Sequence, residues 1–201
     1  MNMTTEQTSE TFVFTSENLE WAKGQIAKYP EGRQASAVMP LLHQAQKQNG
    51  GWLPMSAIDY IADMLEMPKM RVYEVASFYS MYNLKPIGKH LIEVCTTTPC
   101  WLRGSDDVVS AIREELGIGL GETTEDGEFT VLEVECQGAC VNAPVLVYEE
   151  GFYEDLDGKS TKEIIEAIKS GAKPACGSRV GRKSSEPAAG LTSLNVQGGD
   201  A

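Results

Sequence analysis

Two short strand-like runs in this chain of 201 residues end in the same way, each leading into a pair of closely spaced cysteines. The run LIEV precedes Cys95, and the run VLEVE precedes Cys136. Cys100 follows the first of these after four residues, and Cys140 follows the second after three. Four of the five cysteines therefore lie in two short loops, and a fold that brings the loops together gathers four thiols at one place.

The residues between the two cysteine pairs predict a strand, a helix and a second strand. Residues 90–95 and 129–135 are rich in β-branched and other apolar residues, as strands are. Ser105 is the expected N-cap of the helix between them. A strand, a helix and a strand in this order form a parallel pair with a right-handed crossover. Because parallel strands end at the same edge of a sheet, we expect Cys95 and Cys136 to emerge side by side.

The rest of the chain completes an α+β pattern. Residues 145–148 and 152–154 predict a hairpin, and Ser160 with Glu163 forms the expected capping box of a last helix. The resulting order β-α-β-β-β-α resembles a thioredoxin-like domain. Before it, residues 16–79 contain four short amphipathic helix patterns, which predict a small helical bundle.

Composition and pattern divide the chain into four parts. Residues 1–15 are polar without periodicity and predict a mobile leader. Residues 16–86 form the expected helical domain, and residues 87–172 form the expected thioredoxin-like domain. Residues 173–201 are rich in Gly, Pro, Ser, Lys and Arg and predict an extended basic tail. Such a tail is either disordered or becomes ordered on a partner, and the residues alone leave both open.

Composition also excludes several classes of protein. The formal net charge is −12, whereas binding of nucleic acid needs clustered Lys and Arg. No apolar run approaches the ~20 residues of a membrane span, so we expect no direct membrane insertion. The first residues lack the basic start and the apolar core of a signal peptide. We therefore expect a reducing compartment, in which structural disulfides are rare.

Spacing alone leaves three occupants of a four-thiol site open: an iron–sulfur cluster, a zinc ion, or redox thiols and disulfides. A [2Fe–2S] cluster takes two thiolates on each of two irons, which suits two separated pairs. The loops TTTP and QGA between the paired cysteines consist mainly of small and hydroxyl-bearing residues. Such loops let backbone N–H groups approach sulfur, and they favour the cluster.

Other residues that bind metals or cofactors are not grouped with these loops. Cys176 lies in the tail and is interpreted as a free thiol. His43 and His90 lie in a predicted helix and strand, not in the cysteine loops, and are interpreted as structural. Neither a G-x-G-x-x-G motif after a strand nor a Walker motif occurs. We therefore expect that this chain does not bind NADH or flavin itself.

Two stretches around the cysteines carry a family resemblance: CTTTPCWLRGS begins at Cys95, and CQGACVNAP begins at Cys136. Both resemble the cluster signatures of the thioredoxin-like [2Fe–2S] subunit of respiratory NADH:quinone oxidoreductase (complex I), the NuoE family. GGWLP and VASFY extend the resemblance into the helical region, and residues 185–194 resemble the C-terminal extension of mitochondrial and related bacterial members. The resemblance implies that Cys95, Cys100, Cys136 and Cys140 ligate one [2Fe–2S] cluster.

The resemblance also implies a function, that of an electron-transfer subunit in the NADH-dehydrogenase module of complex I. Such a subunit belongs to a proton-translocating enzyme but is not catalytic on its own. FMN and NADH are then bound by a partner flavoprotein, with which the cluster exchanges single electrons, and other peripheral-arm subunits are neighbours. The implied location is peripheral, on the cytoplasmic side of the bacterial inner membrane.

Two alternatives stay open at this point. One is a diaphorase subunit of an NAD-linked hydrogenase or formate dehydrogenase. The other, in a different class, is a zinc-stabilised interaction module.

Overall fold

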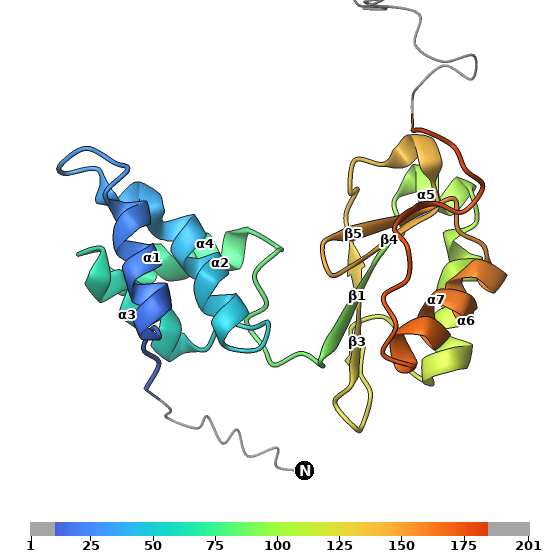
Figure 1. Cartoon of the computed structure of the whole chain (residues 1–201), viewed down its shortest axis with the longest axis horizontal. Coiled ribbons are helices and arrows are strands. Elements are labelled where there is room, and N and C mark those ends of the chain that lie inside the picture. The colour runs from blue at the N-terminus through green and yellow to red at the C-terminus, as the bar shows by residue number, and fades with distance from the viewer. Residues whose placement is uncertain (1–10, 185–201) are drawn as a thin grey trace, which may run out of the picture. The chain divides into compact units, whose positions relative to one another are not determined.

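The computed structural model describes residues 11–184 of the chain. The chain divides into two compact units, Met1–Ile87 and Gly88–Ala201. Helices make up the first unit, whereas a sheet with helices makes up the second (Figure 1). The boundary predicted from the sequence lies between residues 86 and 87.

The first unit contains four α-helices and one 3-10 turn in its described residues. Its elements are α1 (Ser16–Ile26), η1 (Gln34–Ala37), α2 (Val38–Gln48), α3 (Met55–Met64) and α4 (Lys69–Phe78). Apolar residues recur at helical spacing, so α2 and α3 each present one face to a common core. Leu41 and Leu42 of α2 and Ile58 and Ile61 of α3 are fully buried there. The four predicted helices are confirmed.

The stretch before α1 packs more closely than its composition suggests. Phe14 is buried in the core of the first unit, and Phe12 packs against that core. Both rings make edge-to-face contacts with Tyr60 of α3, at centroid distances of 5.8 Å for Phe12 and 5.5 Å for Phe14. The mobile leader expected at residues 1–15 is therefore wrong for residues 12–14, because burial of aromatic rings outweighs the polar residues around them.

The second unit is built on a sheet of six strands in its described residues. Its elements are β1 (His90–Cys95), α5 (Thr98–Leu102), α6 (Ser105–Leu116), β2 (Glu122–Thr123), β3 (Phe129–Val134), η2 (Cys140–Asn142), β4 (Val145–Tyr148), β5 (Gly151–Glu154), α7 (Gly158–Lys169) and β6 (Gly177–Ser178). The strand order is β2-β3-β1-β4-β5-β6. β1 pairs in parallel with β3 and antiparallel with β4, and β4 pairs antiparallel with β5. The predicted parallel pair and hairpin are confirmed.

Helices α6 and α7 lie side by side against one face of this sheet (Figure 1). Their apolar faces and the strands enclose one core, in which Ile112 of α6 and Ile165 of α7 pack with Ile92, Val131 and Leu146 of the three central strands. β1, β3 and β4 carry the most buried residues because they lie in the middle of the sheet. The core thus fixes the strand ends from which the cysteine loops leave.

Both serines expected to cap helices of the second unit lie inside those helices instead. α6 begins at Ser105, and its N-cap is Gly104, whose φ of 100° is left-handed. The N-cap of α7 is Asp157, whose carboxylate accepts a hydrogen bond of 2.7 Å from the N–H of Ser160. Ser160 Oγ accepts one of 2.9 Å from the N–H of Asp157. The predicted capping box therefore exists one turn earlier, with Asp157 and not Ser160 as its first member, and Glu163 takes no part in it.

Residues 174–184, here called the strap, follow α7 along the edge of the sheet. β6 lies in the strap and pairs in parallel with β5, so that Gly177 lies opposite Tyr153. The N–H of Arg179 then donates a hydrogen bond of 3.0 Å to the carbonyl of Glu154. The strap therefore extends the sheet by one short strand.

Only the first part of the expected tail at residues 173–201 is described. Up to residue 184 the tail includes β6 and a turn at residues 179–180. The stretch at 185–194 that carries part of the family resemblance lies outside the described residues, as do residues 1–10 of the expected leader.

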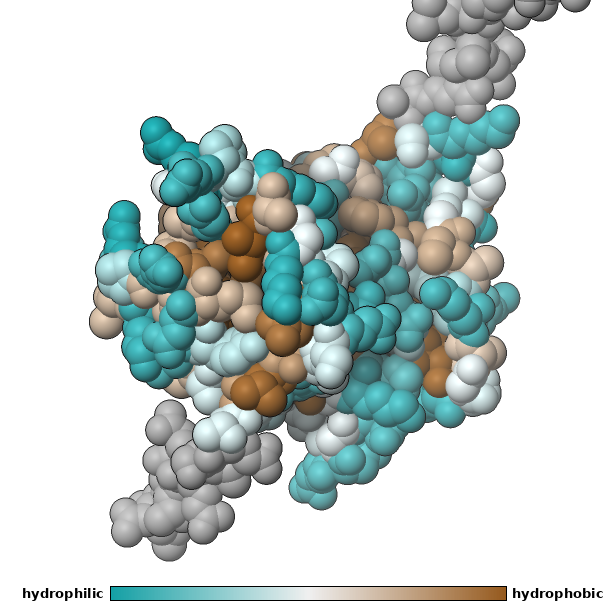
Figure 2. Space-filling model, turned by 60° about the vertical axis from the view of Figure 1, so that its left-hand side comes forward, coloured by the Kyte–Doolittle hydropathy of each residue, from teal (hydrophilic) through white to brown (hydrophobic). Residues whose placement is uncertain are grey.

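The surface of the described residues is mixed in character. On the face seen in Figure 2, hydrophilic side chains surround smaller, separate hydrophobic areas. No helix among residues 11–184 is long and apolar enough to cross a membrane.

Candidate metal centre

The two cysteine pairs lie at the end of the sheet where β1 and β3 finish. Cys95 is the last residue of β1 and lies opposite Val134, the last residue of β3. Cys136 follows two residues beyond Val134. Cys100 lies in the short helix α5, and Cys140 opens the 3-10 turn η2. The parallel register therefore explains how cysteines far apart in the sequence come to one edge of the sheet.

The first pair is buried. Cys95 and Cys100 are each 1% exposed and pack with Ala143 and Val145, which follow the second pair. Pro99 occupies the first turn of α5, where its fixed φ suits the start of a helix. The loop after Cys95 therefore turns at once into the helix that carries Cys100.

The second pair lies at the surface. Cys136 Sγ and Cys140 Sγ are 3.1 Å apart, Cys136 is exposed and Cys140 is half-buried. The N–H of Gly138 points to Cys136 Sγ at 3.4 Å. Gly138 has a φ of 78°, which favours glycine, and this turn lets the short loop fold back on the sulfur. One side of the site is therefore enclosed by protein and the other faces outward.

Hydrogen-bond donors converge on the buried sulfurs. Thr97 Oγ1 lies 3.2 Å from Cys95 Sγ, and backbone N–H groups of Thr97 and Gln137 also reach this sulfur. Burial raises the pKa of Cys95, but these hydrogen bonds and one with Cys100 outweigh burial and leave the pKa below its usual value. Burial, helped by the neighbouring Cys95, raises the pKa of Cys100 to about 12, although the N–H of Val145 opposes the rise. Because Gln137 belongs to the second loop, its N–H links the two loops.

This donor set fits a [2Fe–2S] cluster. The thiols gather as two pairs, as a group of two irons with two thiolates on each requires, whereas structural zinc takes four ligands at one ion. Backbone N–H groups aimed at sulfur also stabilise the negative charge of a thiolate-bound cluster. The expectation that the short loops bring N–H groups to sulfur is confirmed.

The other candidate residues lie elsewhere. Cys176 is in the strap, where it hydrogen-bonds with Tyr153 of β5. His43 lies in α2 of the first unit. His90 is the first residue of β1, and its Nδ1 lies 2.8 Å from Tyr148 Oη. None of the three is in either cysteine loop.

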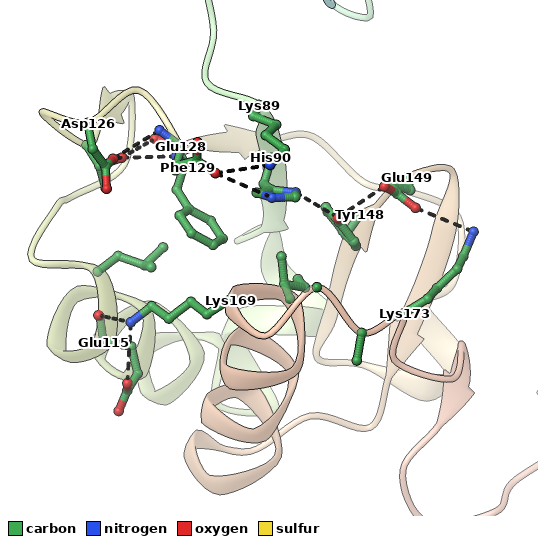
Figure 3. A pocket seen from close by; sticks show the side chains of 15 residues that line it. Lys89, His90, Glu115, Asp126, Glu128, Phe129, Tyr148, Glu149, Lys169 and Lys173 are labelled. Carbon is green, nitrogen blue, oxygen red and sulfur yellow. Dashed lines mark hydrogen bonds and ion pairs between the residues drawn. The ribbon is translucent and has the colours of Figure 1, made fainter.

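A cleft of about 630 Å³ opens at the opposite end of β1 (Figure 3). Its polar side chains bind one another: His90 contacts Tyr148, and Tyr148 Oη donates a hydrogen bond of 3.1 Å to Glu149. Lys173 Nζ lies 3.4 Å from the same carboxylate (Figure 3). The cleft is therefore separated from the cysteines by the length of the strand, and each of its three lysines lies beside a glutamate of the cleft.

No motif in the sequence marks the residues that support the second cysteine loop. Asn142 is buried two residues after Cys140, and its carbonyl accepts a hydrogen bond of 2.7 Å from the N–H of Asp155. Asp155 is a single carboxylate after a strand, and only the tertiary structure reveals what it contacts.

Comparison with known proteins identifies the family. The profile of the family described as thioredoxin-like [2Fe–2S] ferredoxin matches residues 22–169. The chain belongs to this family. Membership confirms the predicted α+β, thioredoxin-like fold and assigns one [2Fe–2S] cluster to this ferredoxin.

The curated relatives of this ferredoxin match most of its length. The NADH-quinone oxidoreductase subunit designated E of Rickettsia typhi is 56% identical over 164 residues, which are 82% of this chain and 96% of the relative. The mitochondrial NADH dehydrogenase [ubiquinone] flavoprotein 2 of Dictyostelium discoideum is 46% identical over 183 residues, which are 91% of this chain and 74% of the relative. The resemblance to the complex I subunit family is thus confirmed.

A solved structure of an NAD+-reducing [NiFe]-hydrogenase in the H2-reduced state matches with a TM-score of 0.60 and 20% identity. The match covers 68% of this ferredoxin and 22% of the hydrogenase chain, so it spans less than a quarter of that chain. At this identity the likeness shows a shared fold.

Proposed function

We propose that this ferredoxin is the electron-transfer subunit of the NADH-dehydrogenase module of respiratory complex I, with Cys95, Cys100, Cys136 and Cys140 as ligands of its [2Fe–2S] cluster. The observation that carries the proposal is the pairing of these thiols at the end of β1 and β3, in a chain 56% identical to the Rickettsia typhi relative over 96% of that relative's length. The chain is part of an NADH:quinone oxidoreductase and is not catalytic on its own.

When bound, a [2Fe–2S] cluster accepts and releases one electron. The protein supplies the surroundings. The buried first pair, Cys95 and Cys100, keeps water from one side. The N–H groups of Gln137, Val145 and Gly138 offset negative charge on the sulfurs.

The partner in the proposal is a flavoprotein subunit that binds FMN and NADH, as the resemblance to the complex I subunit family implies. The surface beside the cysteines supports docking of such a subunit. Cys136 is exposed, and the large apolar side chains of Trp101, Leu102 and Val141, which neighbour cysteines in sequence, are exposed too. Exposed apolar side chains rimming a redox site are typical of a protein–protein interface. Electrons would then be exchanged with the flavoprotein through the outward-facing pair.

The proposal includes a peripheral place on the cytoplasmic side of the bacterial inner membrane, next to other peripheral-arm subunits. It is supported by the bacterial relatives, which are NADH-quinone oxidoreductase subunits. A tagged chain isolated from its own membranes should bring the flavoprotein and membrane-arm subunits with it. Isolation with hydrogenase or formate dehydrogenase subunits instead would favour the diaphorase alternative.

Metal analysis tests the site itself. The chain purified anaerobically should be reddish, contain about two irons and two sulfides, and give an EPR signal after reduction. A colourless protein with stoichiometric zinc would support the interaction module and end the electron-transfer proposal.

A further inference from the structure

Asp155 lies between the strap and the second cysteine loop. It follows β5 directly, has a φ of 54°, and its side chain is only 5% exposed. A carboxylate this well buried is costly unless charged or hydrogen-bonding partners surround it. The partners of Asp155 come from the strap and from the second cysteine loop.

On the strap side, Arg182 binds the carboxylate with two nitrogens. Arg182 Nη2 pairs with Asp155 Oδ1, and Arg182 Nε donates to Asp155 Oδ2 at 3.1 Å. Ser178 Oγ donates to Asp155 Oδ2 at 2.6 Å and accepts from the N–H of Arg182 at 3.0 Å. A two-nitrogen arginine–carboxylate pair fixes direction as well as distance. These contacts hold the strap on Asp155.

On the loop side, the backbone N–H of Asp155 donates to the carbonyl of Asn142 at 2.7 Å. Asn142 Nδ2 donates to Glu154 Oε2 at 2.6 Å, so the residue before Asp155 holds the same asparagine. Asn142 is buried and closes η2, the turn that begins at Cys140. Two consecutive residues at the end of β5 therefore hold the turn that carries Cys140.

The stretch after the first cysteine pair places a further positive charge near Asp155. Arg103, three residues after Cys100, lines a small cavity together with Asp155 and Arg182. Burial raises the pKa of Asp155, but Arg182 and Ser178, with a smaller contribution from Arg103, outweigh burial and hold the pKa below its usual value. The carboxylate is thus stabilised in its charged form, which the pair with Arg182 requires.

We propose that Asp155, held by Arg182 of the strap, is a positioning residue for the metal centre: it fixes the turn that carries Cys140 and so sets how firmly the cluster is held. The inference rests on the proposed role of Cys140 as a ligand. Release of the strap from Asp155 frees the end of β5 and, through Asn142, the turn at the exposed side of the site. Partners that orient ligands are known to affect metal affinity strongly.

The test compares Arg182→Gln with Arg179→Gln in the full chain, purified anaerobically with its cluster. Both changes remove one positive charge from the strap, but the Arg179 side chain lies over the Tyr153 ring, 5.4 Å from its centroid, and not on Asp155. Arg182→Gln should release iron to a chelator about 10-fold faster than the unchanged chain. Its reduced-state EPR signal should broaden or shift. Arg179→Gln should resemble the unchanged chain in both measurements.

Two further variants separate positioning from loss of fold. Arg182→Lys keeps the charge and should restore most of the iron retention and the EPR line shape. Asp155→Asn keeps the N–H to Asn142, tolerates the positive φ, and should release iron at a rate between those of the unchanged chain and Arg182→Gln. Equal iron release and an unchanged EPR signal in Arg182→Gln would overturn the inference. A chain without a cluster before any substitution would instead overturn the proposed function.

Discussion

Cys140 Sγ lies 3.1 Å from Cys136 Sγ at the exposed side of the metal centre, whereas Cys95 and Cys100 are enclosed at its other side. The site is therefore asymmetric. The inner pair is held by the strand end, the short helix α5 and the core, and the outer pair by short turns. An electron partner and a chelator would both approach from the outer side.

Replacement of an outer cysteine is expected to remove or strongly perturb the cluster. Cys136→Ser and Cys140→Ser each remove one of the four proposed thiolates, so the iron content should fall below about two per chain or the visible spectrum should change clearly. Iron and sulfide analysis with the visible absorption spectrum measures this. Cys176→Ser is the matched control, because Cys176 lies in the strap beside Tyr153, and its spectrum should not change. A bleached Cys176→Ser protein would show that the ligand set is wrong.

Trp101 provides a test of the proposed docking surface. Trp101→Glu places a charge on an exposed apolar side chain next to Cys100, and we expect the Kd for the flavoprotein partner to rise about 30-fold, or about 2 kcal/mol. The cluster signal should persist, since the side chain is exposed. Titration of the partner with electron transfer as readout measures the effect. Trp101→Phe keeps an aromatic ring and should lose much less, and equal affinity of the Glu variant would place the partner elsewhere.

The capping box of α7 should contribute measurably to stability. Asp157→Ala removes the carboxylate that accepts the N–H of Ser160, and we expect the free energy of unfolding to fall by about 1 kcal/mol. Denaturant unfolding monitored by circular dichroism measures this. Ser110→Ala, at an exposed position inside α6, is the control and should change stability by less than about 0.5 kcal/mol. A control loss as large as that of Asp157→Ala would contradict the assignment of the cap.

The stabilisation that this cap provides should depend on pH. Hydrogen bonds from the N–H and the hydroxyl of Ser160 hold the pKa of Asp157 below its usual value. The stabilisation is therefore complete above the unfolded-state pKa of about 3.9 and is lost as the pH falls through the lower folded-state pKa. The difference in the free energy of unfolding between the unchanged chain and Asp157→Ala should therefore have its maximum value at pH 7 and be clearly smaller at pH 3. An equal difference at both values would mean that the carboxylate charge is not what caps the helix.

Tyr148→Phe should affect stability but not the metal centre. The change removes a hydroxyl that contacts His90 Nδ1 at 2.8 Å and Glu149 at 3.1 Å, and we expect a loss of about 1 to 2 kcal/mol. These contacts lie at the start of β1, whereas Cys95 is at its end. Unfolding and EPR measured on one preparation test both expectations. An EPR change as large as that expected for Arg182→Gln would mean that the whole sheet, and not the strap contact, governs the cluster surroundings.

The strands and their direction are predictable because two physical signals agree. The runs before Cys95 and Cys136 have the composition of strands, and the helix between them forces the strands to be parallel. That pairing alone brings the cysteine loops to one edge. Helix starts were less predictable, because Asp157 and Ser160 both favour caps and only the backbone shows which of them precedes the first turn.

The sequence pattern misses the shortest elements. β2 and β6 have two residues each, and α5 has five, so none of them is long enough to repeat its period of apolar residues, which is two in a strand and 3.6 in a helix. Burial of Phe14 and the contacts of Asp155 depend on residues distant in sequence. The positions of the thiols can therefore be predicted from the sequence, whereas the contacts that support them cannot.

The register of β1 against β3 has a practical consequence for engineering. The two strands, and not the number of residues that connect them, set the separation of the inner and outer thiols. The turn at residues 125–127 lies on that connection, at the end of β3 remote from Cys136, and its residues are exposed. A peptide tag or spectroscopic label inserted there should leave the cluster in place. A single residue inserted within β1 would instead turn Cys95 to the opposite face of the sheet and remove it from the site.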